Sequence, residues 1–183
     1  MLVPGDKFPE FKLKACVSVE AGKEFKDIST ADTKGKWLVL YSYPKDFTFV
    51  CPTEIVEFDN KGKDFEARGA MVIGGSTDNE FSHLAWRNSH PGLKAIKHPL
   101  AHYSPAFAQA VGLLHPSGGV ALRATVIVDP KGEVRHASVN DLSVGRNIDE
   151  VLRVLDGLQT EQLVPCGWHK GEQTLTEKMK KAG

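Results

Sequence analysis

Apolar runs and amphipathic segments alternate along the middle of the chain. Together they predict a strand at residues 37–43, a helix at 52–69, a strand at 70–76 and a helix at about 79–89. Both strands are nearly continuous apolar runs, which is typical of strands that are buried on both faces. Pro44 ends the first strand, Gly69 suits a helix stop, and Pro91 ends the second helix.

The second half of the chain continues this alternation. Residues 124–129 predict another strand, and residues 130–132 predict a turn into a hairpin partner at 133–139, where apolar and polar positions alternate. Residues 147–158 carry an apolar stripe at helical spacing, whereas residues 160–183 are polar and rich in turns. This order predicts the α/β class, with a three-layer thioredoxin-like fold in which helices flank a mixed central sheet.

The length and the pattern together set the expected domain organisation. A chain of 183 residues can form one compact domain with a full hydrophobic core, but has little room for a second. We expect this domain at residues 1–158 and a C-terminal tail at residues 159–183. The basic segment at 178–181 is interpreted as a solvated terminus.

The charge balance excludes two classes of partner. Lys plus Arg and Asp plus Glu each total 23, so no excess positive charge is available to bind nucleic acid or an anionic membrane. The first residues lack a basic segment followed by an apolar run, and no stretch approaches the ~20 apolar residues of a membrane span. The expectation is a soluble cytoplasmic protein.

The chain has three cysteines, Cys16, Cys51 and Cys166. An odd number argues against the disulfide framework of a small secreted protein. No Cys-x-x-Cys pair occurs, so neither a local zinc knuckle nor a thioredoxin-type dithiol can form. If two of these cysteines pair, they must come from distant segments.

Cys51 lies between the first strand and the long helix, and Pro52 after it is tolerated in a first helical turn. Unpaired amides and the positive end of the helix dipole stabilise a thiolate there, and the thiolate is the reactive form. The Thr48 hydroxyl can accept from the thiol and donate to a peroxide oxygen, while Pro44 can shield the pocket from water. These parts suit attack on an O–O bond. Position alone leaves a second interpretation open, in which Cys51 is simply a small buried hydrophobe.

The spacing of Pro44, Thr48 and Cys51 resembles the signature of the peroxiredoxin family, which reads proline, three residues, threonine, two residues, cysteine. Further segments resemble the family too, so that the likeness covers most of the chain: residues 37–44, 47–54, 78–86, 126–130, 143–147 and 151–158. The chain is most similar to the typical two-cysteine group, which includes the bacterial alkyl hydroperoxide reductase peroxidase subunit. This resemblance favours a reactive Cys51 over an inert one.

The resemblance implies roles for further residues. Arg123 matches an arginine that contacts the reacting sulfur and the peroxide, where a permanent positive charge can balance the charge that moves onto the leaving oxygen. Arg146 matches a second active-site arginine and Glu54 the acid that orients such arginines; for these two the alternative is a surface salt bridge worth ~0–1 kcal/mol. Trp86 matches a tryptophan that packs near the reactive cysteine, with a plain core position as the alternative.

The resemblance also implies a two-step cycle. Attack would leave Cys51 as a sulfenic acid, which condenses with a second thiol. Similar tails bring a resolving cysteine to a neighbouring subunit, which gives this role to Cys166 and implies an intersubunit Cys51–Cys166 disulfide. The order here is Val164-Pro165-Cys166 instead of the usual valine-cysteine-proline, so the reach of the thiol departs from the family pattern. Because a disulfide needs Cα atoms within ~7 Å, the first helical turn is expected to unwind on oxidation.

The expected function is a thiol-dependent peroxidase that reduces hydrogen peroxide and organic hydroperoxides. A dithiol reductant such as thioredoxin, or a flavoprotein disulfide reductase, would regenerate the thiols. Relatives assemble as homodimers into rings, usually decamers. Residues 118–122 lack the Gly-Gly-Leu-Gly insertion of relatives prone to overoxidation, which predicts resistance to sulfinic acid formation.

No cofactor and no metal are expected. His98 and His102 have the four-residue spacing of two ligands on one helical face, but Pro99 and the lack of a third nearby ligand oppose a metal site. The Gly-Gly pairs lack a following Lys-Ser or Lys-Thr, so no P-loop is present. Cys16 matches no family role and is interpreted as a bystander, with a regulatory thiol as the alternative.

Two other functions are compared with the peroxidase. A holdase chaperone, which some relatives become when oxidised or assembled, could coexist with catalysis. A thioredoxin-like disulfide exchanger is opposed by the missing Cys-x-x-Cys and by Thr48 and Arg123 around a single thiol.

Overall fold

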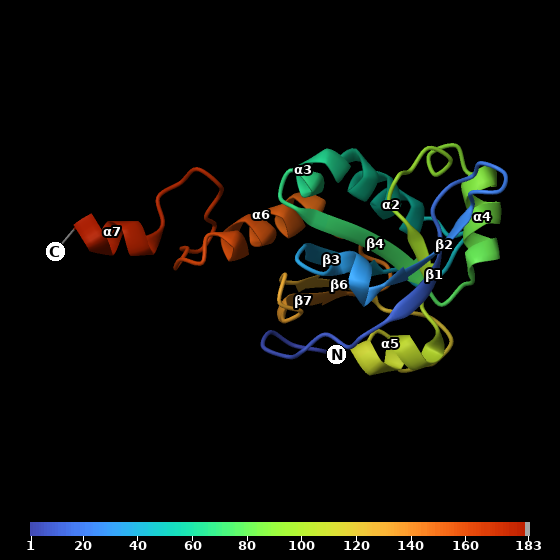
Figure 1. The fold of residues 1–183 in the computed structure, drawn as a ribbon, viewed down its shortest axis with the longest axis horizontal. Coiled ribbons are helices and arrows are strands. Elements are labelled where there is room, and N and C mark those ends of the chain that lie inside the picture. The colour runs from blue at the N-terminus through green and yellow to red at the C-terminus, as the bar shows by residue number, and fades with distance from the viewer. Residues whose placement is uncertain (182–183) are drawn as a thin grey trace. The chain divides into compact units, whose positions relative to one another are not determined.

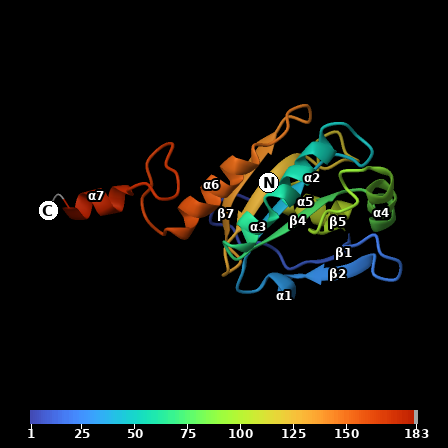
Figure 2. The same cartoon turned by 90° about the horizontal axis from the view of Figure 1, so that it is seen from above.

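The computed structural model describes residues 1–181 (Figures 1 and 2). The chain forms two compact units, one from Met1 to Arg146 and one that begins at Asn147. The second unit therefore includes the last amphipathic helix together with the tail. The division expected after residue 158 stays a prediction.

A mixed seven-stranded sheet forms the centre of the first unit, in the strand order β2-β1-β5-β4-β3-β6-β7. β3 pairs in parallel with β4, and β4 in parallel with β5, whereas all other neighbouring strands of this sheet are antiparallel. The strands are β1 Lys12–Cys16, β2 Phe25–Ser29, β3 Trp37–Ser42, β4 Ala70–Ser76, β5 Leu100–His102, β6 Arg123–Val128 and β7 Val134–Asn140. The expected mixed sheet, with a hairpin formed by β6 and β7, is confirmed.

Helices cover both faces of this sheet, which gives the three layers that the sequence predicts. Figure 1 shows α2 and α3 over one face and α5 over the other. The helices of the first unit are α1 Thr30–Thr33, α2 Cys51–Asn60, α3 Gly62–Glu66, α4 Glu80–Ser89 and α5 Pro105–Val111. The second unit contains α6 Ile148–Gln159 and α7 Leu175–Lys181. Within residues 1–181 no helix combines the length and the apolar character that a membrane crossing needs.

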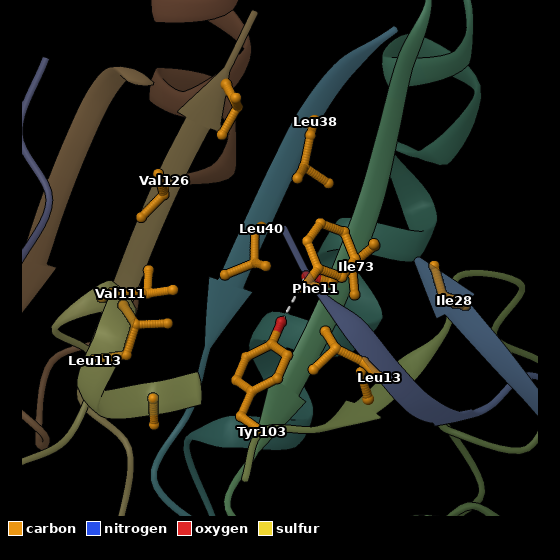
Figure 3. Close-up of a cluster of buried hydrophobic side chains, with 14 of the residues drawn as sticks. Phe11, Leu13, Ile28, Leu38, Leu40, Ile73, Tyr103, Val111, Leu113 and Val126 are labelled. Carbon is orange, nitrogen blue, oxygen red and sulfur yellow. Dashed lines mark hydrogen bonds between the residues drawn. The ribbon is translucent and has the colours of Figure 1, made fainter. Parts of the chain in front are cut away.

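The side chains of β3 alternate between the two faces of the sheet. Leu38 and Leu40 belong to a buried cluster on the α5 side, where Val111 of α5 and Val126 of β6 join them (Figure 3). On the opposite face Tyr41 stacks on Phe58 of α2, with ring centroids 4.0 Å apart. Both faces of β3 are therefore buried, which explains its nearly continuous apolar sequence.

Glycine at position 74 makes room for Tyr41. A Cβ atom at this position would lie 2.4 Å from the Tyr41 ring, closer than any real contact. Gly74 and Tyr41 are partners in the parallel register of β3 and β4. The absence of a side chain at Gly74 thus leaves the space that the Tyr41 ring occupies.

Several elements differ from the sequence prediction or were not predicted. The helix expected at 52–69 is two helices, because the chain breaks at Lys61, whose φ and ψ are −88° and 6°. The structure adds the hairpin of β1 and β2, the three-residue strand β5 and the helices α1, α5 and α7. All of these are short, and their apolar patterns are too brief to reveal a period.

Candidate active site

Cys51 is the first residue of α2 and follows the loop that leaves the buried end of β3. Only 1 % of its surface is exposed. Pro52 occupies the second helical position, where no hydrogen bond is lost, and Val50 provides no side-chain cap. The predicted placement of Cys51 at a helix N-terminus is confirmed, and the unpaired amides there favour negative charge.

Arg123, the first residue of β6, faces the Cys51 sulfur. Its Nη1 and Nη2 atoms each lie 3.7 Å from Cys51 Sγ. Its Nε and Nη2 atoms also donate to the carbonyl oxygen of Leu142, at 3.2 and 2.6 Å, which fixes the plane of the guanidinium. The structure therefore brings together two residues that are 72 positions apart in the sequence.

Glu54 lies one turn after Cys51 in α2 and holds both arginines. One carboxylate oxygen accepts from Nη1 of Arg123 and lies 3.3 Å from Nη1 of Arg146. The other accepts from the backbone N–H of Arg146 at 2.9 Å. Because all three side chains are buried, the alternative of a solvent-exposed salt bridge is wrong for Glu54 and Arg146.

Arg146 is held by the strand as well as by Glu54. Its Nη2 donates to the carbonyl of Ser42 at the end of β3, and its guanidinium carbon lies 5.3 Å from the centre of the Tyr41 ring. Burial lowers the pKa of Arg146, and the Glu54 carboxylate opposes this shift. Arg146 thus stabilises the site through its contacts with Glu54.

The two arginines and the single acid of this buried cluster leave one positive charge unbalanced. Arg123 and Arg146 carry one positive charge each, and Glu54 carries one negative charge. A Cys51 thiolate in contact with Arg123 would bring the sum to zero. A buried charge needs such a partner, and Arg123 would provide it for a negative charge on the sulfur.

Thr48 and Pro44 lie in the loop before Cys51, and both are half-buried. The Thr48 hydroxyl donates to the carbonyl of Lys45 at 2.9 Å and makes no hydrogen bond to Cys51. The expected contact between this hydroxyl and the thiol is therefore not made in the structure. A local partner three residues away satisfies the hydroxyl instead.

Asp46 anchors this loop in the protein interior, and the sequence analysis missed it. Its carboxylate accepts from the Tyr43 hydroxyl at 3.0 Å and the Ser82 hydroxyl at 2.8 Å, and His83 Nδ1 lies 2.8 Å from it. Its backbone N–H donates to Asp78 at 2.8 Å. Its partners Ser82, His83 and Asp78 are more than 30 residues away in the sequence, so the local pattern carried no signal of burial.

Phe47 and Trp86 pack against each other beside this loop, with ring centroids 5.9 Å apart. Phe47 has a φ of 56°, a conformation that few residues other than glycine adopt. Trp86 is buried and also lies 6.0 Å from the Tyr43 ring. The indole therefore packs on the loop that leads to Cys51.

The other two cysteines lie in different surroundings. Cys16 is fully buried at the end of β1, and burial raises the pKa of its thiol, although Arg87 lies 3.7 Å from its sulfur and acts in the opposite direction. Cys166 is exposed in the second unit. None of the three is paired in a disulfide in the structure.

The two histidines considered as metal ligands have other partners. His98 Nε2 lies 2.7 Å from the Tyr41 hydroxyl, and His102 Nδ1 lies 2.9 Å from the Asp78 carbonyl. Over the described residues no group of three or more His, Cys, Asp or Glu side chains could hold a metal ion. A hollow of about 660 Å³ at the start of β3 is lined by Leu38 and Phe11, and none of the predicted site residues lines it.

A buried thiol at a helix N-terminus, held against a guanidinium at the end of a thioredoxin-like sheet, defines a thiol peroxidase. The chain belongs to the AhpC/TSA family, whose model matches residues 4–137.

Two relatives match almost the whole chain. Alkyl hydroperoxide reductase C of Mycolicibacterium smegmatis is 46% identical over 184 residues, which cover 96% of this chain and 94% of the relative. Peroxiredoxin tpx1 of Schizosaccharomyces pombe is 44% identical, over 95% of this chain and 93% of the relative. The family assigned from the sequence is thus confirmed.

Solved structures agree with this assignment. Mycobacterium tuberculosis AhpC superposes with a TM-score of 0.83 at 42% identity, over 92% of this chain and 99% of that chain. The reduced 2-Cys peroxiredoxin of Plasmodium vivax gives a TM-score of 0.87 at 34% identity, over 95% and 93%. The thioredoxin-like fold predicted from the sequence is confirmed.

Proposed function

We propose that Cys51 is the residue that attacks the peroxide and that Cys166 resolves the product. In the first step the Cys51 thiolate bonds to one peroxide oxygen, the O–O bond breaks, and the leaving alkoxide or hydroxide takes a proton. Cys51 is then a sulfenic acid. In the second step the Cys166 thiol displaces water from this sulfur and forms the Cys51–Cys166 disulfide.

The contact between Arg123 and Cys51 is the observation that carries this proposal. Both terminal guanidinium nitrogens lie 3.7 Å from the sulfur, in a buried site where their charge is little screened. As the O–O bond breaks, negative charge moves from sulfur to oxygen, and a fork of two donors can stabilise both atoms. Glu54 and Arg146 hold this fork in place.

Thr48 and Pro44 complete the proposed pocket. The Thr48 hydroxyl donates to the Lys45 carbonyl, and the substrate would replace that carbonyl as its acceptor. Pro44 would limit the access of water to the sulfur. The substrates proposed are hydrogen peroxide and organic hydroperoxides.

The disulfide step requires a local opening. Cys51 is buried in the first turn of α2, whereas a disulfide requires its Cα atom within ~7 Å of the other Cα. Two features favour opening of this turn: Val50 gives the helix no side-chain cap, and Phe49 is 94 % exposed. The turn would unwind after oxidation, and Cys166 of a neighbouring subunit would reach Cys51 in a homodimer.

Further parts of the proposal concern partners. A dithiol reductant such as thioredoxin, or a flavoprotein disulfide reductase, would reduce the disulfide. Exposed aromatic side chains on the first unit support assembly of dimers into a decamer. A cytoplasmic location fits a cycle that depends on a supply of reduced thiols.

The proposal is tested by non-reducing electrophoresis after one equivalent of hydrogen peroxide, together with peroxide loss. Wild type should form a covalent dimer that is absent in Cys51→Ser and in Cys166→Ser. Cys166→Ser should still consume one equivalent, and Cys51→Ser should consume none. Cys16→Ser is the matched control and should behave as wild type. Peroxide consumption by Cys51→Ser would overturn the assignment.

A further inference from the structure

Cys166 occupies a corner of a tight turn in the second unit. The backbone N–H of Trp168 donates to the carbonyl of Pro165 at 3.2 Å, which closes a four-residue turn around Cys166 and Gly167. Gly167 has a φ of 68°, a conformation that suits the third position of a turn and favours glycine. The exposed Cys166 thiol therefore lies on an ordered turn.

The turn ends on a buried indole. Trp168 is only 3 % exposed, and its Nε1 donates to the carbonyl of Glu172 at 2.9 Å. The Glu172 carboxylate accepts from the backbone N–H of His169 at 2.8 Å. These contacts fix the chain directly after the cysteine.

Arg153 of α6 ties the same turn to the helix. Its Nη1 donates to the carbonyl of Trp168 at 3.2 Å. Its Nε and Nη2 donate to the Glu150 carboxylate at 2.5 and 2.7 Å, so the guanidinium is oriented from both sides. The pKa of Arg153 is raised, first by these bonds to Glu150 and less strongly by negative charge on Cys166.

We infer that Arg153 is a positioning residue for the resolving step: it holds the turn at residues 165–168 on α6 and so presents the Cys166 sulfur to the oxidised partner. This inference rests on the proposed function of Cys166. The reaction it serves joins the Cys166 sulfur to the Cys51 sulfur and releases the sulfenic oxygen as water.

Positioning matters here because the sulfenic acid has two fates. It either condenses with Cys166 or reacts with a second peroxide to give sulfinic acid, which is not reversed by thiols. A thiol on a fixed turn meets the sulfenic acid more often than one on a mobile chain, since less conformational freedom must be lost. Loss of the Arg153 contact should therefore shift the products toward sulfinic acid.

The test compares three charge-altering or conservative variants of the second unit. Arg153→Gln removes the contact to the turn, and Arg153→Lys keeps the charge with fewer donors. Lys170→Gln is the matched control, because it removes one positive charge and the 3.3 Å ion pair with Asp156, whereas Lys170 forms no hydrogen bond or ion pair with residues 165–168 in the described part of the chain. The measurements are the rate of disulfide closure by quenched-flow electrophoresis and the sulfinic acid fraction by mass spectrometry.

Arg153→Gln should close the disulfide on the order of tenfold more slowly than wild type, as expected for loss of a hydrogen bond from a charged donor. Its first step, the consumption of one equivalent of peroxide, should keep the wild-type rate. Arg153→Lys should recover part of the closure rate, and Lys170→Gln should match wild type. The sulfinic acid fraction should rise most in Arg153→Gln, less in Arg153→Lys, and not in Lys170→Gln.

The contradicting outcomes are distinct. Closure of Arg153→Gln at the wild-type rate, or equal slowing in Lys170→Gln, would overturn the positioning role and leave the proposed function intact. Absence of any Cys51–Cys166 disulfide in wild type would overturn the proposed function and this inference together. If Arg153→Gln also lost the first step, the substitution would have disturbed the fold. The closure rate of Arg153→Lys would then test the positioning role.

Discussion

At the scale of single residues, the candidate active site is defined by the buried charged side chains of Arg123, Arg146 and Glu54. Glu54 forms ion pairs with both Arg123 and Arg146 through one carboxylate oxygen, and its other oxygen accepts from the Arg146 backbone N–H. The two guanidinium groups therefore depend on one acid.

Replacement of this acid should be costly for the fold. Glu54→Gln leaves two buried guanidinium groups without a counter-charge, which should reduce the free energy of unfolding by about 3–5 kcal/mol. Urea denaturation followed by circular dichroism measures the loss. Glu66→Gln, an exposed change in α3, is the control and should alter stability by less than about 0.5 kcal/mol. Equal stability of the two variants would show that the cluster needs no carboxylate.

At the scale of secondary-structure elements, a histidine joins three segments. His98 precedes β5, its Nε2 contacts the Tyr41 hydroxyl of β3, and its Nδ1 lies 3.4 Å from Asp59 of α2. Asp59 also accepts from the backbone N–H of Lys97 at 2.6 Å. Burial lowers the pKa of His98 below its ordinary value of 6.5, although Asp59 acts in the opposite direction.

This shift predicts how stability depends on pH. Below pH 6.5 the unfolded chain binds a proton at His98 that the folded protein resists, so stability falls as the pH is lowered from about 7 through 6.5. Calorimetric melting between pH 5 and 8 should show this decline. In His98→Gln the decline should be smaller, while His169→Gln, a change at an exposed histidine, should keep the wild-type slope. An unchanged slope in His98→Gln would contradict the prediction.

At the scale of the whole molecule, exposed aromatic side chains lie on and beside α4. Phe25 of β2 and Phe81 of α4 are 40 % and 63 % exposed and pack edge to face, with ring centroids 5.0 Å apart. Phe47, in the loop before Cys51, is exposed as well and packs on Trp86 of the same helix α4. Adjacent exposed apolar groups of this kind favour contact with a second protein surface.

Assembly should therefore respond to a charge at this surface. Phe81→Glu should shift the reduced protein from larger assemblies toward dimers in sedimentation velocity, because a buried carboxylate would lack a partner. Met179→Glu, at an exposed apolar residue of α7, is the control and should leave the distribution unchanged. The same sedimentation profile for Phe81→Glu and wild type would place the contacts between subunits elsewhere.

The local sequence determined the central strands and the position of Cys51 at the start of a helix. The apolar runs at residues 37–43, 70–76 and 124–129 correspond to strands, because a strand buried on both faces needs apolar residues at every position. The placement of Cys51 at a helix start is equally local, since Pro52 restricts the chain to a first helical turn. No local sequence pattern indicates the roles of Arg123, Arg146 and Glu54. They were predicted only from the resemblance to the family.

Only the tertiary structure decided how these residues meet. Arg123 and Arg146 are 69 and 92 positions from Glu54 in the sequence. Their contacts with Glu54 depend on the order in which the strands pair. The burial of Asp46 against Ser82 and His83 likewise follows from neighbours that no sequence window contains. Short-range patterns report backbone conformation and burial, whereas charge pairing depends on distances that arise only when the sheet is assembled.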